Sequence, residues 1–217
     1  MDVQMSQGVA WPDVLPCLAP AVEQAATSAA RVLGEMAGRD IAAGRVALQP
    51  VALADLPLVA GDPERPVVAV HLAVQGATAG HILLALSERM AHGLVDMLLG
   101  QPEGTTTELD ELGRSALAEA GNVAGSFFLT ALAERARAVL APTPPLVLHD
   151  MCGAILDALA AQLALLACEE ALVIETQFTC DGQVVDAAFF MLPAPALLGV
   201  LTGAGAPQEV GHVGRAP

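Results

Sequence analysis

Residues 170–192 read EALVIETQFTCDGQVVDAAFFML. β-Branched and aromatic residues stand on both sides of Asp181-Gly182, a dipeptide that favours a tight turn between antiparallel strands. This stretch predicts a β-hairpin. A second hairpin is predicted where the apolar runs 65–74 and 79–87 are joined through residues 75–78, Gln-Gly-Ala-Thr.

The segments around the two hairpins follow the same order. Each half opens with a long helix (20–38 and about 108–140), contains its hairpin, and closes with a short helix (88–100 and from about 193). We therefore expect an α+β fold made of two duplicated αβ half-units, related by a pseudo-twofold axis. They would share one continuous antiparallel sheet with helices packed against it. The expected boundaries are a tail at 1–19, one domain at 20–203 with half-repeats 20–100 and 107–203, and a tail at 204–217.

Smaller elements complete the expected order. A strand and loop are predicted at 44–57, a short strand at 146–150 and a helix at 151–167. The simplest interpretation of that helix is a core helix. Thr107, with Asp110 three residues later, is typical of a capping box at the start of the second long helix. The sequence APTPP, residues 141–145, should end that helix.

Composition excludes several classes of protein. The chain has 217 residues, 54% of them hydrophobic, which is ample for a full core. Its net charge is −15 and it contains no Lys, so nucleic-acid and anionic membrane partners are not expected, nor is Schiff-base or P-loop chemistry. The four cysteines form no paired spacing and predict reduced, mostly buried thiols in a cytoplasmic protein: Cys17, Cys152, Cys168 and Cys180.

Motifs for common catalytic chemistry are absent from the sequence. His71 and His81 fall in strands that flank one hairpin and could meet across it, but no cluster of further ligands surrounds them, so no metal site is predicted. Nucleophile-elbow, dinucleotide-binding and Walker patterns do not occur. The sequence therefore encodes no internal nucleophile and no nucleotide cofactor that we can identify.

One polar group interrupts the otherwise apolar helix at 115–132. Ser115, Glu119 and Asn122 share one helix face at 100° per residue. Taken alone, they fit a solvated stripe. However, Asn and the glycines at 121 and 125 are poor residues for a helix interior, and small residues allow another backbone to come close. Gly121 and Gly125 are therefore candidates for a partner-binding surface.

The same residues resemble a family signature. Ser115-x-x-x-Glu119-x-x-Asn122, followed after 22 residues by Pro145, is similar to the signature of the CheC, CheX and FliY chemotaxis phosphatases. The likeness extends over about residues 20–203. Its clearest stretches are GATAGHILLAL (76–86), LVDMLLG (94–100), TTELDELGRSALAEAGNVAGSFFLTAL (106–132), HDMCGAILDALAAQLA (149–164) and EALVIETQF (170–178).

The resemblance implies a pseudo-twofold fold in which each half can carry a Glu-x-x-Asn site. In the first half, SAARVLGEM (28–36) aligns with the corresponding family helix, which places Pro20 at the Glu position and Glu23 at the Asn position. The proline position falls on Val46. We therefore expect the first site to be degenerate and only the second to be intact.

The resemblance also implies an activity, hydrolysis of the aspartyl phosphate of a CheY-type response regulator. Asn122 would orient the attacking water and Glu119 would contact the active-site Lys of the regulator, while Ser115 and Pro145 would support the helix and its exit. The protein would need no cofactor of its own, because the regulator supplies Mg²⁺.

A different class of function stays open. CheC proteins also bind the receptor deamidase CheD, and the helix that begins at Asp150 and Met151 resembles the region involved. The chain would then be mainly a regulated binding partner. A FliY-type switch role is less favoured because the chain leaves no room for an extra C-terminal domain. A CheX-like dimer is less favoured because the helix pattern of both halves is closer to CheC.

Overall fold

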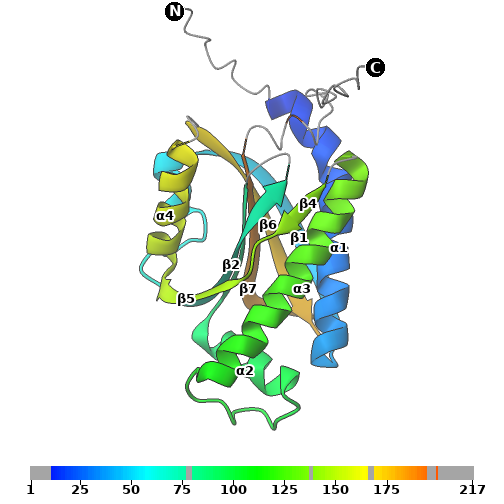
Figure 1. Ribbon diagram of the computed structural model, residues 1–217, viewed down its shortest axis with the longest axis vertical. Helices are drawn as coiled ribbons and strands as arrows, with labels where there is room; N and C mark the ends of the chain where they lie inside the picture. The colour runs from blue at the N-terminus through cyan, green and yellow to red at the C-terminus, as the bar shows by residue number, and fades with distance from the viewer. Residues whose placement is uncertain (1–10, 77–79, 137–138, 166–168, 195–198, 200–217) are drawn as a thin grey trace, which may run out of the picture.

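The computed structural model describes residues 11–76, 80–136, 139–165, 169–194 and 199, and Figure 1 shows them as one sheet with helices on either side. The helices are α1 (Trp11–Ala37), η1 (a 3₁₀ helix, Leu53–Leu58), α2 (Glu88–Leu98), α3 (Glu111–Ala136) and α4 (Cys152–Ala164). The strands are β1 (Ile41–Ala52), β2 (Pro66–Gly76), β3 (Gly80–Leu86), β4 (Leu140–Pro142), β5 (Leu146–Met151), β6 (Glu170–Cys180) and β7 (Gln183–Pro193).

All strand pairs in the sheet are antiparallel, as the sequence predicts. The strand order is β1-β6-β7-β3-β2-β4, and β5 also pairs with β2. If each strand of the first half is exchanged for its counterpart in the second (β1 for β5, β2 for β6, β3 for β7), the same order is read from the opposite edge. This symmetry is what a duplication would produce, with its axis between β7 and β3.

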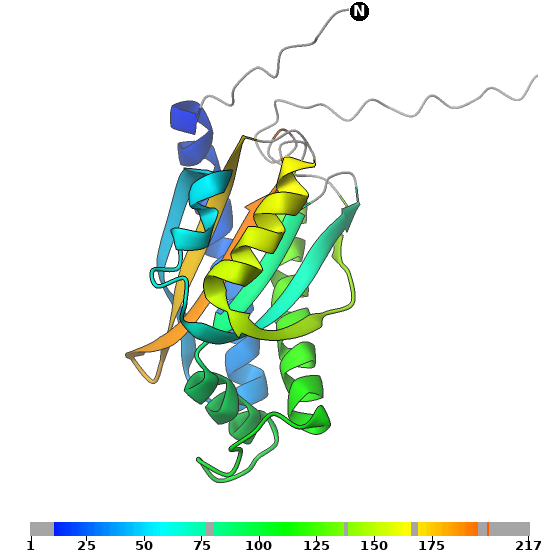
Figure 2. The same cartoon turned by 90° about the vertical axis from the view of Figure 1, so that its left-hand side faces the viewer.

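Successive side chains of the central strands point to opposite faces of the sheet and contribute to two separate hydrophobic cores. Val68, Val70 and Leu72 of β2 face α1, α2 and α3, whereas Val67 and Ala69 face α4 and η1. Figure 1 shows α1 and α3 on one face of the sheet and α4 on the other, and Figure 2 shows α4 and η1 over that second face. A sheet covered on both faces buries every second residue on each side, which accounts for the apolar runs of β2 and β3.

Both predicted hairpins are confirmed. Asp181 and Gly182 have φ angles of 50° and 79°, the left-handed conformation that a type I′ turn requires at both positions. Arg39 ion-pairs with Asp181 and so joins the start of β1 to this turn. In the first hairpin β2 and β3 pair as expected, while residues 77–79 of its turn lie outside the described residues.

The first helix begins earlier than the sequence suggests. Residues 11–19, assigned to a tail, form the first turns of α1, which continues through Pro16 and Pro20. Tertiary contacts stabilise these first helical turns, because Leu18 is buried in the core and Trp11 donates a hydrogen bond to Glu170 at 2.9 Å. The two prolines lie on the exposed side. The short helix expected from about residue 193 lies almost wholly outside the described residues.

The boundaries of α3 also differ from the prediction. Asp110, rather than Thr107, caps the helix, and its Oδ1 accepts the backbone N–H of Gly113 at 2.7 Å. The loop before it is held by Asp96, a buried residue whose carboxylate accepts the backbone N–H groups of Gly104, Thr105 and Thr106. Hydrogen bonding from the Thr106 side chain, followed by these backbone groups, lowers the pKa of Asp96. The loop is therefore anchored to α2 before α3 begins.

Two glycines set the distance between α3 and the sheet. A Cβ on Gly121 would lie 2.5 Å from Cγ1 of Val70, and one on Gly125 would lie 3.4 Å from Cδ1 of Leu72. Both glycines are buried against β2. The prediction that they form a partner-binding surface is thus wrong, because the close approach they allow is to the protein's own sheet.

We predict that Gly121→Ala lowers the free energy of unfolding by roughly 1–3 kcal/mol, because the new methyl group overpacks the contact with Val70. Gly93→Ala is the matched control. No atom lies within 4 Å of a Cβ at Gly93 of α2, so the gain in helix propensity should raise stability by up to about 1 kcal/mol. Urea unfolding measures both. The clash would be refuted if adding Val70→Ala to Gly121→Ala gave additive losses rather than partial rescue.

Candidate functional site

The polar motif lies on the outward face of α3. The inward face packs on the sheet and on α1 through Leu117, Ala120, Ala124, Phe128 and Leu132. Between Glu111 and Glu134 the helix is long and apolar enough to cross a membrane by composition alone, but 50% of its most apolar part is buried within the protein, as in a core helix. The apolar character of α3 is thus accounted for by packing.

Ser115, Glu119 and Asn122 are brought together by helical spacing alone. Ser115 and Glu119 are exposed and Asn122 is half-buried. Within the described part of the chain, none of the three side chains takes part in a hydrogen bond or an ion pair. A half-buried carboxamide and a nearby carboxylate with no internal partner retain their full capacity to bind a partner molecule.

Pro145 lies where the edge strand is interrupted. β4 and β5 both pair with β2, and the pairing shifts by one residue between Val74↔Pro142 and His71↔Leu146. Thr143 bridges the shift, because its backbone N–H donates to Ala73 O at 2.8 Å and its Oγ1 accepts from Ala73 N at 3.0 Å. Proline lacks a donor and is tolerated at such an edge bulge. Pro145 lies between β4 and β5, directly before β5, and its supporting role stays a prediction.

The corresponding positions of the first half lie on α1 and β1. Pro20 and Glu23 are both exposed on α1, and Val46 is half-buried in β1. Proline at position 20 has no carboxylate, and Glu23 has no carboxamide to hold a water as Asn122 can. Degeneracy of this half stays a prediction that the placement agrees with.

Comparisons with known proteins show what the chain is similar to. No family model matches the chain. The chain is 31% identical over 137 residues to the CheY-P phosphatase CheC of Bacillus subtilis strain 168, an alignment that spans 61% of this chain and 65% of CheC. FliY of Thermotoga maritima has the same fold, with a TM-score of 0.64 and 20% identity over 89% of this chain and 96% of FliY.

A second structural match comes from the CheX–CheY–BeF₃–Mg²⁺ complex of Borrelia burgdorferi, with a TM-score of 0.51 and 18% identity over 80% of this chain and 96% of the matched chain. In sequence this chain is similar to CheC, and in fold it is similar to FliY and to the chain matched in the CheX–CheY complex.

Outside the motif, this CheC-like chain has one pair of histidines that could suggest a metal. Nε2 of His71 lies 3.1 Å from Nδ1 of His81, so one ring donates and the other accepts. Among the described residues no group of three or more His, Cys, Asp or Glu gathers. Burial lowers the pKa of both imidazoles, that of His81 to about 4 with a further contribution from His71. The pair is thus a neutral, hydrogen-bonded contact within the sheet.

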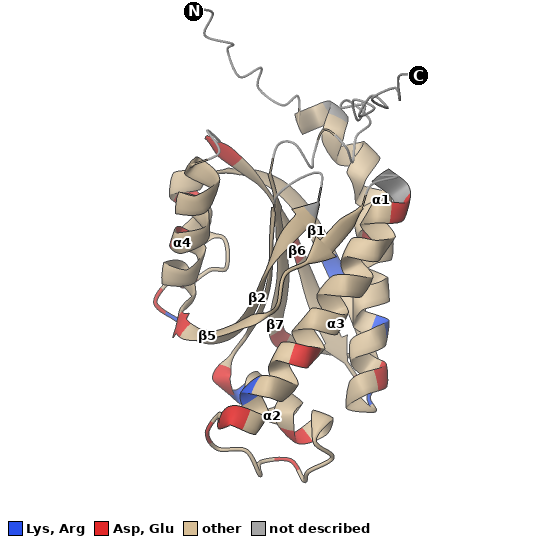
Figure 3. Cartoon of the chain, viewed as in Figure 1, with Lys and Arg blue, Asp and Glu red and all other residues tan. Residues whose placement is uncertain are grey.

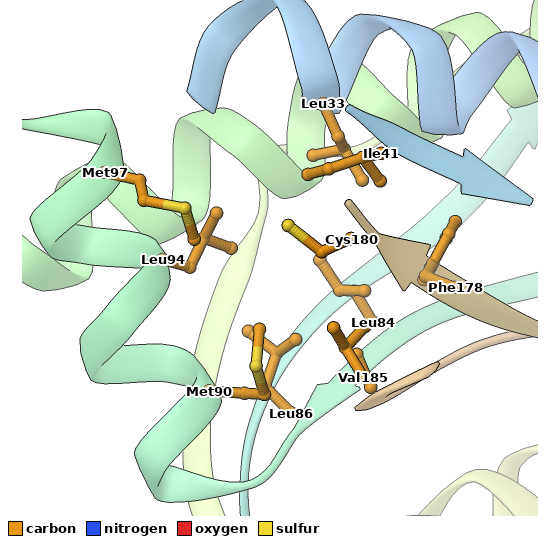
Figure 4. A pocket seen from close by; sticks show the side chains of 11 residues that line it. Leu33, Ile41, Leu84, Leu86, Met90, Leu94, Met97, Phe178, Cys180 and Val185 are labelled. Atoms are coloured by element: carbon orange, nitrogen blue, oxygen red, sulfur yellow. The ribbon is translucent and has the colours of Figure 1, made fainter. Parts of the chain in front are cut away.

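An apolar cavity of about 40 Å³ lies between α1, α2 and the sheet (Figure 4). The side chains around it come from α1, α2 and the sheet: Leu33, Ile41, Leu84, Leu86, Met90, Leu94, Met97, Phe178, Cys180, Val185 and Ala187. It contains no charged side chain that could hold a phosphorylated substrate. Burial raises the pKa of the Cys180 thiol, which argues against a reactive role.

The other described cysteines are also free thiols. Cys17 is exposed and Cys152 is buried, and burial raises the pKa of Cys152. Cys168 lies outside the described residues. The expectation of mostly buried thiols is therefore met by Cys152 and in part by Cys180, but not by Cys17.

The His71–His81 pair should make stability depend on pH. A folded-state pKa of about 4 for His81, below the ordinary value of about 6.5, means that the unfolded chain binds the extra proton between these values. We predict that the pair's contribution, roughly 3 kcal/mol, is present above pH 6.5 and is lost as pH falls towards 4. Urea unfolding of wild type and His81→Phe measures this. If wild type and His81→Phe lost the same free energy of unfolding between pH 7 and pH 4, the prediction would be contradicted. The interval from pH 7 to 8 is the internal control, because the His81 proton contributes no change there.

Proposed function

We propose that this protein hydrolyses the aspartyl phosphate of a CheY-type response regulator. The observation that carries the proposal is the outward pair Glu119 and Asn122 on α3, without internal partners, in a chain related to a CheY-P phosphatase. The Borrelia complex, which contains CheX and CheY, supports the same class of partner. The chain spans about 65% of the length of this relative.

The reaction suits a site that has no nucleophile of its own. An aspartyl phosphate is an activated mixed anhydride. Water attacks phosphorus, the bond from phosphorus to the aspartyl oxygen breaks, and inorganic phosphate leaves with a proton from the water while the carboxylate is regenerated. No His, Cys or Lys occurs in α3. Catalysis then depends on placing the water and stabilising charge, as with the water-orienting Gln of GTPases.

We assign the placement of the water to Asn122. Its carboxamide oxygen accepts a hydrogen bond from the water and its NH₂ group donates to a phosphoryl oxygen, which fixes the water in line with the breaking bond. A half-buried side chain on a helix packed tightly against β2 has few other conformations to adopt. The rigid helix therefore reduces the entropy that water placement would otherwise cost.

Glu119 holds the regulator in register. Its exposed carboxylate lies one helical turn before Asn122 and would pair with the active-site Lys of the regulator. Ser115 lies a further turn earlier on the same face and supports this end of the site, and Pro145 supports the edge strand beside it. The regulator brings the Mg²⁺ that offsets phosphoryl charge, so the proposal requires no metal or other cofactor from this chain.

We place a single active site in the second half, and we place the activity in the cytoplasm because its substrate is a signalling protein of that compartment. Binding to a CheD-type deamidase stays a prediction. Asp150 and Met151 are both exposed at the start of α4, while the rest of that helix buries one face against β2 and β6 side chains.

Asn122→Ala should lower kcat for phosphate release from the phosphorylated regulator by roughly 100-fold, because the water loses its orientation. The fold should survive, since Ala is a better helix residue than Asn by about 0.5 kcal/mol. Phosphate release against each response regulator of the host measures this. Glu23→Ala at the degenerate position is the control and should be fully active. Wild-type rates in Asn122→Ala would remove this residue from the mechanism.

Glu119→Ala should weaken the complex and slow the reaction together. Loss of one charge-assisted contact raises KM by about tenfold and lowers kcat as the water site loses register. Glu119→Gln should recover part of kcat, because its size is retained, but little of KM. The same steady-state assay separates the two constants. Full activity in both variants would show that Glu119 lies outside the interface.

A further inference from the structure

One aromatic side chain of α3 lies on the surface beside the motif. The chain has five phenylalanines, and four of them are buried in the core, whereas Phe127 is 41% exposed. Phe127 follows Glu119 by eight residues, so it lies about 80° from it around the helix and about 12 Å along the axis. Val123, which is half-buried, lies between them, about 40° from each. Asn122 lies about 60° from Glu119 in the other direction. Phe127 and Val123 therefore form an apolar border along one side of the motif.

The ring of Phe127 is held by the long helix of the other half. Figure 1 shows α1 and α3 side by side and running in opposite directions. The guanidinium of Arg31 on α1 lies over this ring, 5.6 Å from its centroid, and Nη1 of Arg31 also pairs with Glu35 at 2.5 Å. A cation over the face of an aromatic ring is attracted by the negative charge of that face. The contact limits the motion of the exposed ring, so a partner would lose less entropy in packing on it. In Figure 3 the two helices carry acidic and basic positions around an otherwise uncharged surface.

Exposure alone does not make Phe127 a docking residue, because single apolar side chains are ordinary on protein surfaces. Its distance from the motif is the further argument. A stable contact between two proteins covers about 800 Å² on each partner, the area of a disc about 16 Å in radius. Over the surface of the helix, Phe127 lies about 14 Å from Glu119 and about 12 Å from Asn122. A folded protein bound over Glu119 and Asn122 would therefore reach Phe127.

We propose that Phe127, with Arg31 over its ring, is a docking contact for the response regulator and sets the register in which the phosphoryl group meets Asn122. The inference rests on the proposed function. The regulator needs no unusual surface for this contact, because more than half of an ordinary protein surface is contributed by apolar atoms. Burial of an aromatic ring under a partner is a typical source of binding energy. Phe127 and Arg31 lie too far from the reacting atoms to touch them, so both are positioning residues. The half that is predicted to have lost its own site would thus contribute, through Arg31, to the site of the other half.

Steady-state hydrolysis separates docking from chemistry. Phe127→Ala should raise KM for the phosphorylated regulator about tenfold and change kcat by less than about twofold. Phe127→Leu should recover part of the loss in KM, since it keeps most of the apolar area. Arg31→Gln should raise KM by about threefold, because the ring remains but loses its cation. Leu58→Ala is the matched control. Leu58 is 58% exposed on η1, over the other face of the sheet, and its loss should leave KM unchanged.

A binding measurement separates this inference from the proposed function. The Asn122→Ala protein should bind the regulator loaded with BeF₃⁻ and Mg²⁺, and Phe127→Ala in that background should weaken binding about tenfold. An active wild type whose KM is unchanged by Phe127→Ala and Arg31→Gln overturns the docking contact alone, as does a fall in kcat with no change in KM. A wild type that neither binds nor dephosphorylates any regulator of its host overturns both.

Discussion

The contact between the glycines of α3 and the apolar side chains of β2 fixes the geometry on which the rest of the site depends. Gly121 lies directly against Val70, and Gly125 against Leu72, so the helix lies closer to the sheet than a helix with side chains at these positions could. This contact sets the rotation of α3 about its axis. Since the glycine side faces inward, Glu119 and Ser115 face solvent and Asn122 sits at the border.

The sequence predicts the parts of the fold that depend on local chemistry. The Asp181-Gly182 turn and the alternation in β2 and β3 are properties of neighbouring residues, and both hairpins follow from them. The motif is also readable, because i, i+3 and i+4 spacing places residues on one face of any helix. The sequence does not show which face of the helix points to solvent. Gly121 and Gly125 indicate a close approach by another segment, and only the tertiary structure shows that this segment is β2.

Features that depend on distant contacts were missed for the same reason. Residues 11–19 contain two prolines and resemble a tail until Leu18 and Trp11 meet the core and Glu170. Asp96 stands in a helix whose spacing favours a solvent position, yet the loop beginning at Gly104 wraps its carboxylate. The cap moves from Thr107 to Asp110 as a consequence. The local signal for such a loop is the run of small residues at 104–107, which follows Asp96 at the end of α2.

The symmetry of the strand order explains how one half can lose its polar pair without loss of the fold. The two long helices α1 and α3 pack on the same face of the sheet, and each is held there by its apolar side. Positions on the opposite side, such as Pro20 and Glu23 or Glu119 and Asn122, contribute little to that packing. They are therefore free to diverge between the halves, and function at each can be lost independently of stability.

An open helix face also determines where specificity must come from. The apolar cavity between α1, α2 and the sheet is lined by no charged side chain, and the motif lies on the outward face of α3. An exposed helix face cannot select a substrate by enclosing it. It suits a phosphoryl group that is already enclosed by another folded protein, because only a projecting side chain can reach such a group. In the proposed reaction, selection among response regulators would depend on the surface of α3 around Glu119 and Asn122.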